Sequence, residues 1–225
     1  VAPGSLNLSA FETYYDEKRP FFIAGASAFW FGGMRCMFCS NTSGLGAFYS
    51  RRIGRPPQIE GWVDDHSAYA DVPETTSILG AAKVTGRTDG GYTIGILDAV
   101  TGRETAHYIP AVGEEEQSQV AEPLTNYFVG RLKKELRGGA TTVGGIVTST
   151  IRRTADPVVH DRLHGHAEAA GLDWRHSWGG REYSWMGSVL VSNVAGSAAA
   201  IEGTQRSSAR YFHRPDREVS GDGLF

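Results

Sequence analysis

The chain has 225 residues and a formal net charge of −3, so charge gives no reason to expect nucleic acid or an anionic membrane surface as a partner. No run approaches the roughly 20 consecutive apolar residues of a membrane-spanning helix, which excludes a helical membrane protein. The length allows one or two soluble domains or one modest barrel, whose strands need an apolar residue only at every second position.

Residues 1–75 lack a regular pattern, and we interpret them as an entry segment. Aromatic residues, prolines and paired arginines are frequent there, and the strand-like runs, such as 21–23 and 47–49, are short. Cys36 and Cys39 form a C-x-x-C pair without a second cysteine pair. We favour a local disulfide in an oxidising periplasm, with free buried thiols and a metal or redox role as alternatives.

Six strand-like runs follow and meet in pairs across short Gly-rich turns. The runs cover residues 79–87, 92–100, 125–137, 140–152, 165–177 and 182–192. Long polar connections at 101–124, at 153–163 and from 193 onward separate the pairs. Short turns at one end and long loops at the other are typical of an up-and-down barrel in an outer membrane, although soluble barrels share the pattern.

The length and the two faces of these runs favour an outer-membrane barrel over a soluble one. The runs have 9 to 13 residues. Strands that cross an outer membrane need about 9 to 11, whereas globular strands average about 5 to 6. One face is smooth and apolar, and aromatic residues cluster near the short turns, where an interfacial girdle would lie. The apolar positions include Val143, Val147, Ile151, Val189 and Val191.

The opposite face is polar, and in a barrel it would line a wet lumen and tune selectivity without catalysis. We therefore expect a polar ligand there. The candidate ligand-binding residues are Lys83, Arg87, Arg131, Lys133, Glu135, Arg137, Asp173 and Arg175.

Other polar groups receive a simpler interpretation. The histidines at 160, 164 and 166 lack a zinc motif and are read as part of a solvated loop. The arginines at 51, 52 and 55 are expected to pair with carboxylates such as Asp16 and Glu17 rather than to bind nucleic acid. No G-x-S-x-G element or P-loop is present, so we expect no catalytic residue, metal or cofactor.

Five stretches of the sequence resemble one bacterial family. They are FETYYDEKRPFFIAG at 11–25, FYSRRIGR at 48–55, ILGAAKVTGR at 78–87, NYFVGR at 126–131 and TQRSSARYF at 204–212. Together they resemble the outer-membrane barrel region of the domain-of-unknown-function family 5916. Ala24 departs from the pattern, in which an acidic residue is expected. The resemblance implies a bacterial outer-membrane location and an upstream β-sandwich similar to family 9 carbohydrate-binding modules, but no reaction.

The sequence thus predicts an all-β fold: an antiparallel up-and-down meander that forms part of an outer-membrane β-barrel. The entry segment is 1–75, and 76–225 supplies about three hairpins. Six strands leave two edges unpaired, so we interpret the chain as a fragment. Expected partners are outer-membrane lipid and a polar or carbohydrate ligand. The alternatives are a soluble all-β binding domain and a barrel-associated hydrolase whose site lies outside this fragment.

Overall fold

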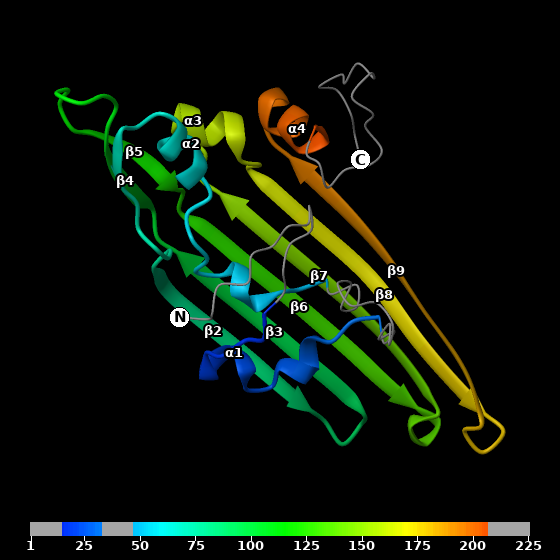
Figure 1. Cartoon of the computed structure of the whole chain (residues 1–225). Coiled ribbons are helices and arrows are strands. Elements are labelled where there is room, and N and C mark those ends of the chain that lie inside the picture. The colour runs from blue at the N-terminus through cyan, green and yellow to red at the C-terminus, as the bar shows by residue number, and fades with distance from the viewer. Residues whose placement is uncertain (1–14, 33–46, 207–225) are drawn as a thin grey trace.

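The computed structural model describes residues 15–32 and 47–206, which form two antiparallel sheets and several short helices (Figure 1). The larger sheet has the strand order β2-β3-β6-β7-β8-β9. Its strands are β2 (Ile78–Arg87), β3 (Tyr92–Thr101), β6 (Thr125–Leu136), β7 (Thr141–Arg152), β8 (His166–Trp178) and β9 (Tyr183–Ala195).

All six expected strands are confirmed, with bounds close to those predicted. Every neighbouring pair is antiparallel, and the short turns after β2, β6 and β8 lie together at one end of the sheet (Figure 1). The all-β class is therefore confirmed for the described part of the chain. Within that part, β2 and β9 are edge strands and the sheet does not close into a barrel.

The connection at 101–124 is not the loop that the sequence suggested. It contains β4 (Glu104–Ile109) and β5 (Gln117–Glu122), which join β1 (Tyr69–Asp71) in a second sheet of order β1-β4-β5. A small core formed by Ile59, Val63, Ala106, Tyr108, Val120, Ala121 and Val159 packs this sheet against two helices, α2 (Glu60–Asp65) and α3 (Pro157–Arg162). This unit lies at the end of the large sheet opposite the short turns (Figure 1).

The other two long connections also contain helices. In the second connection, the Asp156 side chain caps α3 by accepting a hydrogen bond from Val159 N at 3.1 Å. In the third, Ser197 caps α4 (Ala198–Gln205) in the same way. Both caps are residue types with a side-chain oxygen that satisfies a free N–H group at a helix start. None of the helices in the described ranges is long and apolar enough to span a membrane.

The two faces of the large sheet differ sharply. One face, which we call the covered face, packs against an N-terminal segment that comprises residues 15–32 and 47–55. That segment contains α1 (Pro20–Ile23), η1 (Ala26–Phe29) and η2 (Ser50–Arg52). Phe22, Phe29 and Ile53 from the segment form a core with Leu97, Ala99, Tyr127, Val129 and Ile146 from the sheet.

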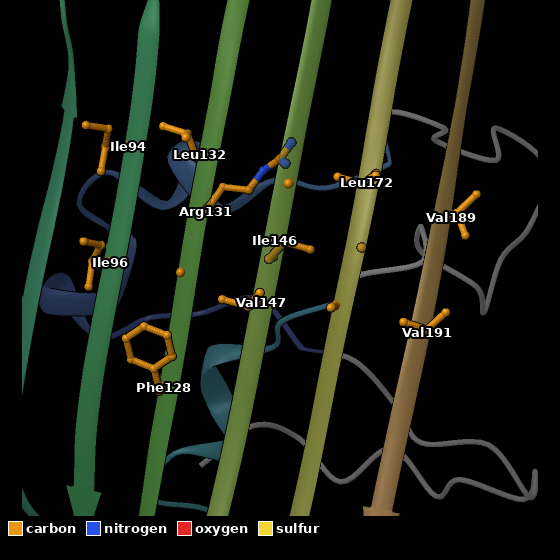
Figure 2. Close-up of a pocket in the computed structure, with 14 residues that line it drawn as sticks. Ile94, Ile96, Phe128, Arg131, Leu132, Ile146, Val147, Leu172, Val189 and Val191 are labelled. Carbon is orange, nitrogen blue, oxygen red and sulfur yellow. The ribbon is translucent and has the colours of Figure 1, made fainter.

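The opposite face, which we call the bare face, is apolar and has no covering layer in the described structure. Leu172 is 62% exposed, Val191 63% and Val147 48%. Figure 2 shows these side chains with Ile94, Ile96, Phe128, Leu132 and Val189 along adjacent strands. They line a shallow hollow of about 780 Å³ that runs across strands β3 to β9.

Candidate functional site

The N-terminal segment is held together by a carboxylate that links its two parts. Glu17 Oε2 accepts a hydrogen bond from Ser50 Oγ at 2.6 Å and forms an ion pair with Arg19 Nη2 at 2.7 Å. Arg19 in turn donates to the main-chain carbonyls of Ile53 at 2.7 Å and Ser50 at 3.0 Å. Residues 17–19 and 50–53 therefore form one polar cluster, although 30 residues of sequence lie between them.

Further contacts reinforce this cluster. The Tyr49 hydroxyl accepts a hydrogen bond from Tyr15 N at 2.9 Å and donates to Tyr15 O at 3.1 Å. Arg51 donates to the main-chain carbonyl of Asp16 at 2.9 Å, whereas the sequence suggested an ion pair with its carboxylate. Glu17 is paired with Arg19, two residues away, rather than with the later arginines.

Three glycines shape the covered face to accept the segment. A Cβ atom on Gly95 would lie 3.0 Å from the Phe29 ring, and one on Gly171 would lie 2.5 Å from the Phe31 ring. A Cβ atom on Gly144 would lie 2.5 Å from Arg131 Nη1. Real side chains essentially never approach as closely as 2.5 Å, so the sheet surface is recessed under Phe31 of the segment and under the Arg131 side chain.

Three of the eight predicted ligand-binding residues contact the segment directly. Lys83 Nζ donates to the carbonyls of Phe21 and Ala24 at the end of α1. Arg131 Nε donates to Trp30 O at 3.0 Å, and Arg131 Nη2 forms an ion pair with Asp173 Oδ1 at 2.7 Å. The Arg131 and Asp173 side chains are only 1% and 17% exposed. These side chains hold the segment in place.

The other five candidates lie nearer the short turns. Arg87 forms an ion pair with Glu135 at 2.7 Å, and Lys133 pairs in register with Gly144 on the same face. Arg137 lies in the turn after β6 with a positive φ of 53°, and Arg175 is opposite Thr142. Their role in ligand binding stays a prediction.

The chain matches the model of a family described as a domain of unknown function, DUF5916, over residues 3–213. The chain belongs to DUF5916. Searches of curated proteins and of solved structures gave no match. Family membership agrees with the resemblance found in the sequence. In this DUF5916 chain, two of the stretches that carry the resemblance, 11–25 and 48–55, meet in the cluster around Glu17.

The structure supports no ligand or metal site at the other candidate residues that it describes in the DUF5916 chain. Cys36 and Cys39 lie outside the described residues. His160 belongs to α3 and lies 3.1 Å from Asp161, and His164 Nε2 is 2.9 Å from Thr204 Oγ1. No group of three or more His, Cys, Asp or Glu residues within 15–32 and 47–206 is arranged to hold a metal ion.

Sequence reasoning missed one feature of the covered face. Arg152, at the end of β7, lines a cavity of about 240 Å³ together with Arg52, Arg55 and Tyr127. The alternation of β7 placed Arg152 on the polar face. Its neighbours could not be identified from the sequence, because the segment that carries Arg52 and Arg55 is brought there by tertiary packing.

Acid is expected to weaken the docking of the N-terminal segment. Partial burial of Glu17 tends to raise its pKa, but the hydrogen bonds and charge of Arg19, together with the Ser50 hydroxyl, lower the pKa from 4.5 to about 2. Because the pKa is lower in the folded state, the contribution of Glu17 to stability is fully present above pH 4.5. That contribution is expected to fall progressively as the pH drops from 4.5 toward 2.

Urea unfolding monitored by tryptophan fluorescence between pH 2 and 6 measures this effect. Glu17→Gln is expected to cost about 1 kcal/mol at pH 6, because the ion pair is partly exposed, and to flatten the pH dependence in that window. Glu116→Gln is the matched control, since Glu116 is exposed and pairs only with exposed His107. An unchanged pH dependence in Glu17→Gln would contradict the assignment.

Proposed function

We propose that the large sheet of this DUF5916 chain is part of a bacterial outer-membrane β-barrel, with the bare face against lipid and the covered face toward a polar lumen. The observation that carries the proposal is the bare face itself. Exposed apolar side chains continue across neighbouring strands in one patch, and a patch of this kind marks a surface that contacts a membrane or another protein.

The distribution of charge supports lipid as the occupant. In a soluble sheet protein, the inward face is apolar and the charged residues point to water. Here the charged side chains Lys83, Arg131 and Asp173 lie on the covered face, beside the apolar core that it forms with the N-terminal segment. The exposed apolar side chains, such as Leu172 and Val191, lie on the opposite face. A membrane barrel has this arrangement, with polar residues inside and apolar residues outside.

Strand length and aromatic placement agree with the proposal. The six strands have 10 to 13 residues each, which is enough to cross the apolar layer of an outer membrane. Aromatic rings gather at the β8–β9 turn: Trp178 stacks on Tyr183 at 5.9 Å, and Trp174 lies 5.5 Å from Trp185. Such rings are favoured at the boundary between lipid and water.

The open edges require additional strands. β2 and β9 have no further strand partner in the described structure, and unpaired backbone groups are very costly in lipid. We propose that further strands, from a longer protein or another chain, complete the barrel. The docked segment would then lie inside the lumen as a plug-like element, and the barrel would bind or pass a polar ligand such as a carbohydrate.

A scan of single cysteines along β9 tests the lipid contact. Residues 186–191 are replaced one at a time in full-length protein in which Cys36 and Cys39 are serine, and spin-labelled after reconstitution into liposomes. Labels at 187, 189 and 191 are expected to collide preferentially with oxygen, and labels at 186, 188 and 190 with a water-soluble nickel complex. The alternation follows from the two faces of the strand.

The alternative, a soluble all-β binding domain, predicts a different result. Its bare face would be covered by another protein layer, so labels at 187, 189 and 191 would be inaccessible to both reagents. The protein would also remain in the aqueous phase on detergent extraction. Either result would overturn the barrel proposal. No arrangement in the described residues favours a hydrolase.

A further inference from the structure

A small cavity on the covered face brings together three arginines from separate parts of the sequence. Its volume is about 240 Å³, and its walls come from residues 47–55 of the N-terminal segment and from strands β6 to β9. Arg52 and Arg55 line it from the segment, and Arg152 lines it from the end of β7. The remaining polar wall consists largely of hydroxyl-bearing residues, including Tyr127, Thr148, Thr150 and Ser192.

Two of these arginines, Arg55 and Arg152, have donors that the described residues leave unsatisfied. Among the residues that the structure describes, no carboxylate forms an ion pair with Arg55 or Arg152. Arg152 Nη1 donates to the His164 carbonyl at 3.0 Å, but the Nε–H groups of Arg152 and Arg55 are buried without an acceptor in that part of the chain. Buried N–H donors are nearly always hydrogen-bonded, so these two mark a site that the acceptor atoms of a bound ligand can fill.

Two nearby carboxylates are engaged elsewhere. The charge of Glu122 acts on Arg152, but its oxygens accept hydrogen bonds from Gln58 N at 2.9 Å and Gln58 Nε2 at 2.7 Å. Glu168 also contributes to the cavity wall, but it pairs in register with Ser149, whose side chain belongs to the bare face. Its Oε2 accepts a hydrogen bond from Asn193 at 3.3 Å.

We propose that this arginine cavity binds the anionic group, a phosphate or a carboxylate, of a polar ligand. Guanidinium groups present N–H donors in a planar fork that matches the oxygens of both anions. The volume is below the about 300 to 1,000 Å³ of pockets for drug-sized ligands, so it suits a single anionic group or a small sugar acid. This inference rests on the polar-ligand part of the proposed function and does not depend on contact with lipid.

Calorimetric titration of the purified full chain in detergent tests the cavity, with inorganic phosphate, glucuronate and neutral glucose as probes. Saturable binding is expected for phosphate, glucuronate or both. The probe that binds shows whether the cavity takes a phosphate or a carboxylate. Arg55→Gln and Arg152→Gln are each expected to weaken binding about 10-fold or more, as for the loss of one charge-assisted hydrogen bond. The anion affinity of Arg152→Lys is expected to lie between those of the wild type and Arg152→Gln, because lysine keeps the positive charge but lacks the planar guanidinium group.

Arg181→Gln is the matched control, since Arg181 is an exposed arginine in the β8–β9 turn, at the short-turn end of the sheet, and donates to the Gly138 carbonyl at 3.1 Å. It should bind the anion like the wild type. Anion binding that does not saturate, saturable binding of glucose of equal strength, or equal weakening in Arg181→Gln would overturn the proposal.

A second measurement needs no variant and applies even where the substituted proteins fail to fold. Phenylglyoxal modifies arginine side chains, and its rate at each residue of the wild type is followed by mass spectrometry. The bound anion is expected to slow modification of Arg55 and Arg152 but not of the exposed Arg181. No protection of Arg55 and Arg152 would overturn the site. Because both measurements are made in detergent, their failure would leave the lipid contact of the bare face untouched.

Discussion

Asp173→Ala is expected to destabilise the protein by about 3 to 5 kcal/mol and to loosen the N-terminal segment from the sheet. The Arg131 side chain is only 1% exposed, and Asp173 is its ion-pair partner at 2.7 Å. Without this carboxylate, a guanidinium charge would remain buried and unpaired. Asp173 also accepts a long hydrogen bond from Gly32 N at 3.4 Å, so the segment would lose a direct contact as well.

Urea unfolding gives the free-energy change, and trypsin cleavage after Lys18 reports release of the segment; the bond after Arg19 resists trypsin because Pro20 follows it. Arg131→Met is expected to cost less than Asp173→Ala, because Asp173 is 17% exposed and retains some water when unpaired. The double variant Arg131→Met, Asp173→Leu should be closer to wild-type stability than Asp173→Ala, since replacing both charges with apolar groups removes the uncompensated charge. Equal costs for the double variant and for the sum of Arg131→Met and Asp173→Leu, each measured as a single change, would contradict a coupled pair.

The strands of the large sheet were predictable because each is marked by a pattern within its own residues. Each has the two-residue alternation of a sheet with unlike faces, and glycine-rich turns fix the register of β2–β3, β6–β7 and β8–β9. The hairpin β4–β5 escaped prediction because its strands have only six residues each and mix a few buried apolar residues, such as Ala106 and Val120, with polar ones. The helix α3 was not predicted either, although its start, a capping Asp156 followed by Pro157 in the first turn, is a local pattern.

The docked segment could not be predicted in the same way. Its contacts join residues far apart in sequence, such as Glu17 with Ser50 and Arg131 with Trp30. The sequence predicted one smooth apolar face toward lipid, and glycines in the strands fit such a face. Gly95, Gly144 and Gly171 instead lie on the covered face, where Phe29, Arg131 and Phe31 occupy the space of a missing side chain. The composition of a strand does not distinguish these two uses of glycine.

Val147→Arg is expected to reduce the stability of the protein in lipid bilayers by about 2 to 4 kcal/mol. Val147 is near the middle of β7 on the bare face, so the new charge would lie near the centre of the apolar layer. In water the same change adds a charge to a side chain that is already 48% exposed, and surface changes of that kind usually stay within about 0.5 kcal/mol. The size of the effect therefore distinguishes a surface in lipid from a surface in water.

Reversible unfolding in liposomes, followed by tryptophan fluorescence in urea, measures the difference. Ser188→Arg is the control on the opposite face, because Ser188 pairs with Asp173, whose side chain belongs to the covered face. Its cost should be below about 1 kcal/mol, since a charge on the lumen side remains in contact with water. Val147→Leu should be nearly neutral, because it keeps the surface apolar. Equal stability of Val147→Arg and Val147→Leu in liposomes would place the bare face in contact with water and remove the main support for the barrel.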